Sequence, residues 1–388
     1  MTESLKCVLV EQAASVAFKP PDLDVIARDS TRRIRRRRAV ATLAAAATVV
    51  VLAGTAVIVS TQPNRRPDLA DNRPAAAASW AIGSTIHDGH GTIEVGHEVR
   101  ALVRTSVGFV TVDGANNVYS VAGRSVTRIG QAFPAAQDGG EQVRLVSDPH
   151  GSLAGWIGQD GSHLVLYVYD QAIGRTHYYG AEGAGFNGVD FFAIDDRTAY
   201  WRIADRGAFA VNLDTGEQRQ LANADEARYL KIWSVESRVL AFSPDQDPRG
   251  NVTSLRVGPA LDNAREFTFG ENAEADDTIR LSPTAAWIAY LRYEFNGPPI
   301  RDDVRAVDAQ VRDTATGEQV ALTLPKQSYA VPVMWLDDTT LQVVVFGPES
   351  AMWTCVIPDG FCSVVSMLSP DEIEGSALVL PNGTSVTN

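Results

Sequence analysis

Three observations predict that residues 80–388 form an all-β fold, a six-bladed β-propeller with four-stranded blades. Short runs rich in Val, Ile, Tyr, Phe and Trp alternate with turns of Gly, Asp, Asn and Pro, as expected for many short strands. Six of these runs are strongly apolar and recur at a nearly constant interval, and turns of one type follow several of them. A period of about 40–50 residues is typical of propeller blades, in which each repeat is one sheet.

The six apolar runs are the clearest of these signals. With one central residue of each run as a marker, the successive intervals are 45, 45, 41, 47 and 55 residues. The longest interval contains the segment 296–303 (NGPPIRDD), which indicates a loop insertion. Each run therefore predicts one blade. The markers are Val110, Gly155, Tyr200, Ala241, Ile288 and Val343.

Tight turns are predicted at residues 212–217 (NLDTGE) and 313–318 (DTATGE), with a looser version at 170–175. Gly216 and Gly317 can adopt the positive φ that such hairpins need, and the Asp and Thr side chains can hydrogen-bond the turn. The same turn type in several repeats supports a repeating sheet.

Two segments, 242–245 (FSPD) and 281–290 (LSPTAAWIAY), resemble the S-P-D-G-x-x-I-A-Y unit of TolB-type propeller repeats. The segment 335–341 (WLDDTTL) is similar to a variant opening of the last blade. The resemblance covers about residues 98–366 and implies architecture rather than a specific function. Because a propeller must close its ring to avoid an exposed edge, a closing strand is expected, either from the hairpin at 80–96 or from residues 377–380.

The N-terminal part of the chain has a different charge balance. Residues 1–38 hold nine basic and five acidic side chains, a net charge of +4, so the rest of the −13 chain has −17. The uncharged stretch 39–60 (AVATLAAAATVVVLAGTAVIVS) follows and is long enough to span a bilayer as a helix. The arginines before it predict a cytoplasmic N-terminus. They are Arg32, Arg33, Arg35, Arg36, Arg37 and Arg38.

Other interpretations of residues 39–60 fit less well. A cleaved signal peptide has a shorter apolar region and a shorter leader. A lipoprotein signal needs Cys where Thr55 stands, and a twin-arginine signal would not continue with four further arginines. A buried core helix does not explain the neighbouring arginine block. We therefore predict a single-pass type II protein of the cell membrane: a cytoplasmic leader (1–38), a transmembrane helix (39–60), a linker (61–79) and an extracytoplasmic propeller (80–388).

The leader is expected to form a small amphipathic helix over residues 4–18, which either docks on a cytoplasmic partner or only sets topology. The arrangement of an Arg-rich leader, one span and a propeller is similar to membrane proteins common in actinobacteria. The 30 arginines against four lysines fit a high-GC genome.

Two of the three cysteines are expected to form a disulfide. Cys355 and Cys362 flank a Pro-Asp-Gly turn signal at 358–360, so they should face each other across a hairpin. The segment is predicted to lie outside the cytoplasm, where disulfides persist. Cys7, in the leader, should stay reduced.

Candidates for metal binding are weak. His87, His90 and His97 are the only histidine cluster, but no helix or defined spacing supports a site. Asp245 and Asp247 have the D-x-D start of a calcium loop. However, Arg249 stands where a third oxygen ligand belongs, and Arg256 where a bidentate Glu is needed. We therefore predict no metal and no cofactor.

No catalytic motif is present, and no catalytic residue is predicted. Adjacent acids such as Asp195-Asp196 and Asp337-Asp338 indicate solvated turns, because neighbours on a strand point to opposite faces. The acidic balance argues against nucleic acid as a partner. The leading interpretation is a non-catalytic binding, sensor or scaffold module whose propeller binds a protein, a peptide or an envelope glycan. Two alternatives stay open: a regulator whose leader engages a sigma factor or another cytoplasmic partner, and a propeller hydrolase or lyase.

Overall fold

The computed structural model describes residues 77–386, with gaps at 90, 134, 138–139, 162, 181–188, 245–253, 269–272, 276–277, 296–303, 326–328, 348, 370–377 and 384. The predicted leader, the spanning helix 39–60 and Arg32, Arg33 and Arg35 to Arg38 lie outside the described residues. Among the residues that are described, no helix has the length and apolar character needed to cross a membrane.

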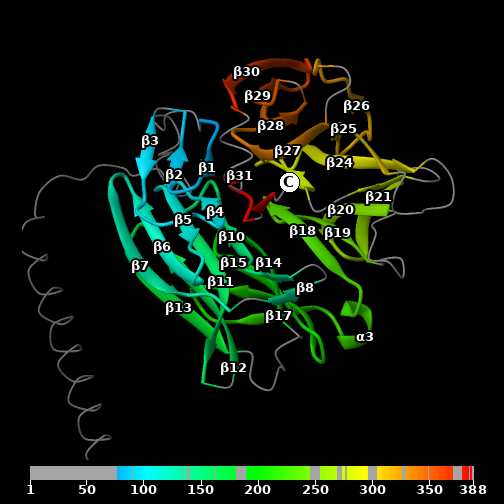
Figure 1. The fold of residues 1–388 in the computed structure, drawn as a ribbon. Helices are drawn as coiled ribbons and strands as arrows, with labels where there is room; N and C mark the ends of the chain where they lie inside the picture. The colour runs from blue at the N-terminus through cyan, green and yellow to red at the C-terminus, as the bar shows by residue number, and fades with distance from the viewer. Residues whose placement is uncertain are drawn as a thin grey trace, which may run out of the picture. The chain divides into compact units, whose positions relative to one another are not determined.

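Seven antiparallel sheets form the blades of the described fold, so the prediction of a β-propeller is correct and the prediction of six blades is wrong. The blades are arranged around a common centre (Figure 1). In blades 1 to 6 the strands follow one another from the centre outward. Blade 1 contains β4 (Ala101–Arg104), β5 (Phe109–Val112), β6 (Asn117–Ala122) and β7 (Ser125–Gln131). Blade 2 contains β10 (Leu145–Ser147), β11 (Leu153–Asp160), β12 (His163–Asp170) and β13 (Arg175–Gly180).

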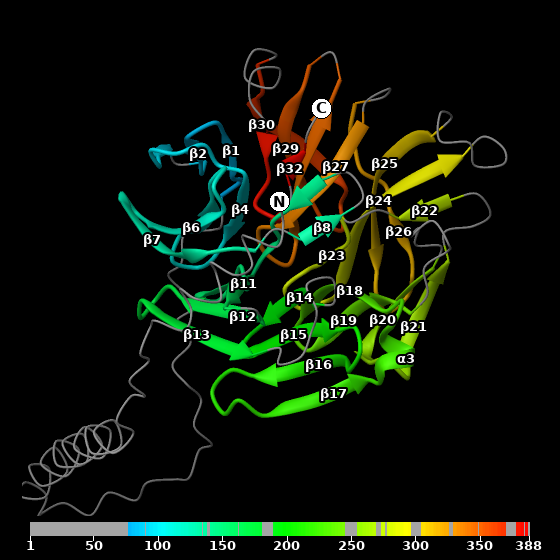
Figure 2. The ribbon, with the colours of Figure 1, turned by 60° about the horizontal axis from the view of Figure 1, so that its bottom comes forward.

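The next two blades have the same order. Blade 3 contains β14 (Val189–Asp195), β15 (Thr198–Ile203), β16 (Gly207–Asn212) and β17 (Gln218–Ala222). Blade 4 contains β18 (Lys231–Glu236), β19 (Val239–Ser243), β20 (Ser254–Ala260) and β21 (Asn263–Thr268). The short helix α3 (Ala224–Ala227) connects them, with Asn223 as its N-cap, and packs against β16 and β17 (Figure 2).

Blade 5 has its first strand in two pieces, β22 (Ala273–Ala275) and β23 (Arg280–Leu281), which both pair with β24 (Trp287–Phe295). It continues with β25 (Val304–Asp313) and β26 (Gln319–Val320). Blade 6 contains β27 (Tyr329–Trp335), β28 (Thr340–Phe346), β29 (Ala351–Val356) and β30 (Phe361–Met367). A separate two-stranded sheet, β8 (Ala135–Gln137) with β9 (Gly140–Gln142), lies between blades 1 and 2 in the sequence.

Blade 7 is built from both ends of the described chain. β1 (Trp80–Ile82), β2 (Thr85–His87) and β3 (Thr92–Glu94) come from the N-terminal end, and β31 (Leu378–Val379) and β32 (Ser385–Val386) from the C-terminal end. Ala81 pairs with Val379, so β1 and β31 lie side by side, blue against red in Figure 1. Both candidate closing segments are therefore used, and together they form a seventh blade.

The hydrophobic core consists of seven clusters, one between each pair of neighbouring blades. The cluster between blades 2 and 3, for example, contains Phe191 and Trp201, both 0% exposed. Side chains of one sheet pack on the next all the way around the ring, including between blades 6 and 7 and between blades 7 and 1. Because every blade is covered on both faces, its second strand is largely buried; all residues of β5 are buried.

The predicted turns have the expected geometry. Gly216 and Gly317 have φ of 73° and 80°, and the N–H of each donates to the carbonyl four residues earlier at 2.8 Å. The Asp313 carboxylate also accepts hydrogen bonds from the N–H groups of Ala315 and Thr316. The two Ser-Pro pairs that resemble the TolB unit lie at different places in their blades. Ser282 follows β23, part of a first strand, whereas Ser243 ends β19, the second strand of blade 4, so the two segments are not equivalent in position.

Candidate functional site

The first strands of the blades surround a central cavity of about 100 Å³. Residues of β4, β10, β14, β18, β23 and β27 contribute to its wall, as do Pro381 and Asn382 after β31. Every blade therefore contributes to this central cavity. Polar groups from distant parts of the sequence can come together there. Arg144 and Arg280 line it together with Ser147, Ser234 and Glu236.

Four acidic side chains gather where the first strands end and the chain turns into the second strands. Asp195 ends β14 and Glu236 ends β18, in equivalent registers: each pairs with the first residue of the next strand, across a two-residue turn. Asp148 follows β10, and Asp338 lies in the turn after β27. We call these four residues, from blades 2, 3, 4 and 6, the acidic mouth.

Hydrogen bonds between neighbouring blades hold the turns of the mouth in place. Arg238 N donates to Asp195 Oδ2 at 2.7 Å, and Thr284 N donates to Asp338 Oδ1 at 2.7 Å. The hydroxyl of Ser237 donates to the carbonyl of Pro283 at 2.8 Å. These contacts link blade 3 to blade 4, blade 4 to blade 5 and blade 5 to blade 6, so the carboxylates have positions set by the ring.

Asp148 is fixed within its own turn instead. Its Oδ1 accepts hydrogen bonds from His150 N at 3.0 Å and Gly151 N at 2.7 Å. Burial raises the pKa of Asp148 to about 6, because the two hydrogen bonds offset the loss of solvent only in part and the nearby Asp195 and Asp196 add repulsion. Burial also raises the pKa of Asp195.

Burial raises the pKa of Glu236 well above the ordinary range, and the carboxyl groups of Asp148, Asp195 and Asp338 raise it further. Within the described part of the chain, no hydrogen bond to the Glu236 carboxyl occurs. The charged groups that shift its pKa most are all acidic, while Arg144 and Arg280 line the same cavity and Arg238 lies close to Asp195.

Two of the three candidate histidines, His87 and His97, stack on aromatic side chains. His87 stacks on Trp80 with ring centroids 4.9 Å apart. His97 stacks on Tyr119 at 4.0 Å, its Nε2 lies 3.1 Å from Thr111 Oγ1, and burial lowers its pKa. His90, Asp245 and Asp247 lie outside the described residues. Among the residues described, no three His, Cys, Asp or Glu side chains gather as metal ligands.

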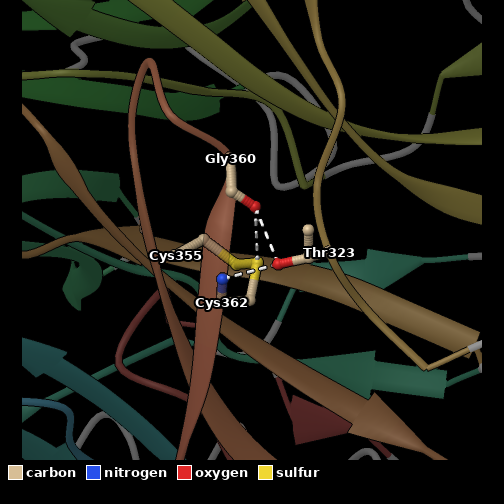
Figure 3. The surroundings of a disulfide bond; sticks show 4 residues. All are labelled: Thr323, Cys355, Gly360 and Cys362. Atoms are coloured by element: carbon tan, nitrogen blue, oxygen red, sulfur yellow. Dashed lines mark hydrogen bonds between the residues drawn. A yellow bond between two sulfur atoms is a disulfide. The ribbon is translucent and has the colours of Figure 1, made fainter.

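The predicted disulfide is present. Cys355 on β29 and Cys362 on β30 are direct partners in the strand register, 4.0 Å apart at Cα, and their sulfurs are bonded (Figure 3). Thr323 of blade 5 supports the turn beside them. Its hydroxyl accepts a hydrogen bond from Cys362 N at 2.9 Å and donates to Gly360 O at 3.1 Å.

A second cavity, of about 500 Å³, lies between blades 3 and 4. Its apolar residues include Leu230, Leu240 and Phe242, and Arg219 and Arg256 also line it. Arg256 is engaged by Glu266, with its Nη2 3.3 Å from Oε2. Residues of only two blades form it, and the acidic mouth therefore remains the stronger candidate site.

Comparisons with known proteins assign the chain to no family. No family model matches the chain, and no curated protein matches it. Solved structures resemble it with low identity. A chain of a mitotic checkpoint complex has a TM-score of 0.43 at 11% identity and covers 88% of this chain and 91% of its own. The dihydro-heme d1 dehydrogenase NirN has 0.42 at 14%, with 76% and 66% covered. TolB from Acinetobacter baumannii has 0.36 at 10%, with 74% and 65% covered.

Proposed function

We propose that this protein is a binding module whose propeller takes the cationic side chain of a protein or peptide ligand at the acidic mouth. Residues 39–60 would anchor the propeller at the cell membrane, with the propeller outside the cytoplasm. The observation that carries the proposal is Glu236, a half-buried residue that lines the central cavity and whose pKa is raised by Asp148, Asp195 and Asp338. An ammonium or guanidinium group would relieve the repulsion among these carboxyl groups.

The charges of the mouth favour a basic side chain over a sugar. Asp148, Asp195 and Asp338 raise the pKa of Glu236, and a bound cation relieves repulsion among carboxylates, whereas a neutral sugar ring does not. Of the ligand classes expected from the sequence, a basic peptide segment therefore fits better than an envelope glycan.

The test is a calorimetric titration of the full-length chain with an acetylated tetra-arginine peptide at pH 7.5 and low salt. Asp195→Asn and Asp338→Asn keep the oxygens that accept from Arg238 N and Thr284 N but remove the charges. Each is expected to weaken binding about tenfold, in line with the loss of one charge-assisted contact. Asp205→Asn, an exposed acid outside the mouth, is the matched control. Equal weakening by all three variants, or no binding to the wild type, would refute the proposal.

Acid–base catalysis is a second candidate, because carboxyl groups with raised pKa values cluster at functional sites. Asp148, with a pKa of about 6, could hold and release a proton near neutral pH, and Glu236, whose pKa is raised, could hold one. Hydrolysis of small chromogenic esters and glycosides by the wild type, abolished in Glu236→Gln, would support this function. Turnover that persists in Glu236→Gln, or no turnover of either substrate class by the wild type, would count against it.

A further inference from the structure

The outermost strand of blade 6 is an open sheet edge. β30 stands at the end of the order β27-β28-β29-β30, and beyond Cys362, whose N–H donates to Thr323 Oγ1, its outer backbone N–H and C=O groups have no strand partner among the described residues. It is seven residues long, reads FCSVVSM and contains no charge. An unpaired, uncharged edge is a template on which another strand can pair.

The other outermost strands are protected against such pairing. β3, β7, β13, β17 and β21 each have at least one charged residue, and β26 is only two residues long. Charge and short length are the usual protections of a sheet edge. β30 has neither, which makes it the exception among the seven blades. The charged residues are Glu94, Arg128, Arg175, Arg219, Arg265 and Glu266.

Exposed apolar side chains concentrate on the same hairpin. Among the described residues nine large hydrophobic side chains are exposed, and five of them lie on β29 or β30. The register between the two strands shifts by one residue there, so that Val364 and Val365 are both on the surface. A concentration of exposed apolar side chains on one hairpin, unlike scattered single residues, indicates an interaction surface. The five exposed fractions are Val356 42%, Phe361 64%, Val364 47%, Val365 42% and Met367 54%.

The hairpin that presents this edge is held rigidly. The Cys355–Cys362 disulfide joins β30 to β29 at its first turn, and Thr323 of the neighbouring blade binds Cys362 N (Figure 3). Both sulfur-bearing residues are buried. A strand that is ordered before a partner arrives loses little conformational entropy on binding.

We propose that β30 pairs with β30 of a second copy of this chain, antiparallel around a two-fold axis, so that two blades become one continuous sheet. Charge selects this partner. In a symmetric pair each residue faces the same short segment of its copy, so Arg128, Arg175 or Arg219 would meet an identical charge, which destabilises cross-strand pairs. β30 brings no charge to its copy, although the chain as a whole has a net charge of −13.

The experiment measures the protein mass of the full-length chain by light scattering, corrected for bound detergent. The wild type is expected at twice 41.7 kDa. Val364→Lys should raise the dissociation constant at least ~100-fold, because it places two like charges across the paired edges. The matched control is Thr127→Lys, the same change at an exposed residue of β7, and it should stay dimeric. A monomeric wild type at ~100 μM, or a dimer that survives Val364→Lys, would overturn the proposal.

A second variant tests the contact directly. Val364→Cys should form a disulfide-linked dimer under mild oxidation, because each copy presents the residue to the same strand of the other. Val107→Cys, on an exposed turn of blade 1, should remain unlinked. Circular dichroism of each variant checks folding. Equal cross-linking of the two variants would place the contact elsewhere and would also overturn the proposal.

Discussion

The side-chain amide of Gln342 exchanges two hydrogen bonds with the backbone of Ser79, 263 residues earlier in the chain. Ser79 N donates to Oε1 at 3.1 Å, and Nε2 donates to Ser79 O at 3.0 Å. Both residues are fully buried. Gln342 belongs to the second strand of blade 6, and Ser79 directly precedes β1, so this side chain joins blade 6 to the N-terminal part of blade 7.

Gln342→Met should destabilise the propeller. The variant keeps the size of the side chain but leaves the N–H and C=O of Ser79 buried without partners, at a cost of about 1–3 kcal/mol for each group. We expect the free energy of unfolding in urea to fall by about 3 kcal/mol. Gln319→Met on β26, where the glutamine is exposed, should change it by less than about 0.5 kcal/mol. Equal effects of the two substitutions would contradict the role of the Gln342–Ser79 pair.

Asp148→Asn should stabilise the protein at high pH. The pKa of Asp148 is about 6 in the folded state against an ordinary 3.8, so folding favours its protonated form and stability is lost as pH rises from about 4 to about 6. Asn cannot ionise but still accepts from His150 N and Gly151 N. The gain at pH 7.5 should reach about 3 kcal/mol, the equivalent of about two pKa units, and should vanish below pH ~4. Urea unfolding at both pH values checks this, and a loss of stability at pH 7.5 would contradict it.

Affinity for the tetra-arginine peptide should rise with pH if the proposed function is correct. The carboxyl groups with raised pKa values, Asp148, Asp195 and Glu236, must release protons before they can pair with a cation. Between pH 5 and 7.5 the binding constant should increase about tenfold, as one proton with a pKa of about 6 is lost. Calorimetric titration in buffers of constant ionic strength measures it. A flat profile would mean that these groups do not contact the ligand.

Removal of the disulfide should weaken blade 6. The bond closes a loop between residues seven apart in sequence. The double variant Cys355→Ala, Cys362→Ala is expected to lose about 2–3 kcal/mol of unfolding free energy, chiefly because the unfolded chain is no longer constrained. Thermal unfolding with and without reductant gives the comparison, and Cys7→Ala is the control. An unfolding midpoint that does not respond to reductant in the wild type would contradict the prediction.

The repeat could be predicted from sequence because each of the six apolar runs is the second strand of a blade. A second strand is covered by neighbouring blades on both faces, so it shows a mostly apolar run rather than alternation; β28, for example, is buried at five consecutive residues, of which four are apolar. The seventh blade could not be predicted from such a run, for a physical reason. Its second strand, β1, is only three residues long, and the strand that precedes it in the sheet comes from the other end of the chain.

The acidic mouth could not be predicted in the same way. Adjacent acids such as Asp195 and Asp196 indicated solvated turns, yet Asp195 is only 9% exposed and binds Arg238 N of the next blade. The carboxyl groups that meet come from four different blades, and no local spacing reveals such a gathering. One signal was available: Asp195 and Glu236 both stand three residues before the start of an apolar run, at Thr198 and Val239.

The division of blade 7 between the two ends of the chain has a consequence for biosynthesis. β1, β2 and β3 leave the ribosome first, but β31, their partner in the sheet, is among the last segments to be made. The ring therefore closes only after translation of the whole domain, and until then the edge of β1 that pairs with β31 stays unpaired. Because the pairing of Ala81 with Val379 brings the two ends together, a circularly permuted chain with new ends in a surface turn should keep the same seven sheets.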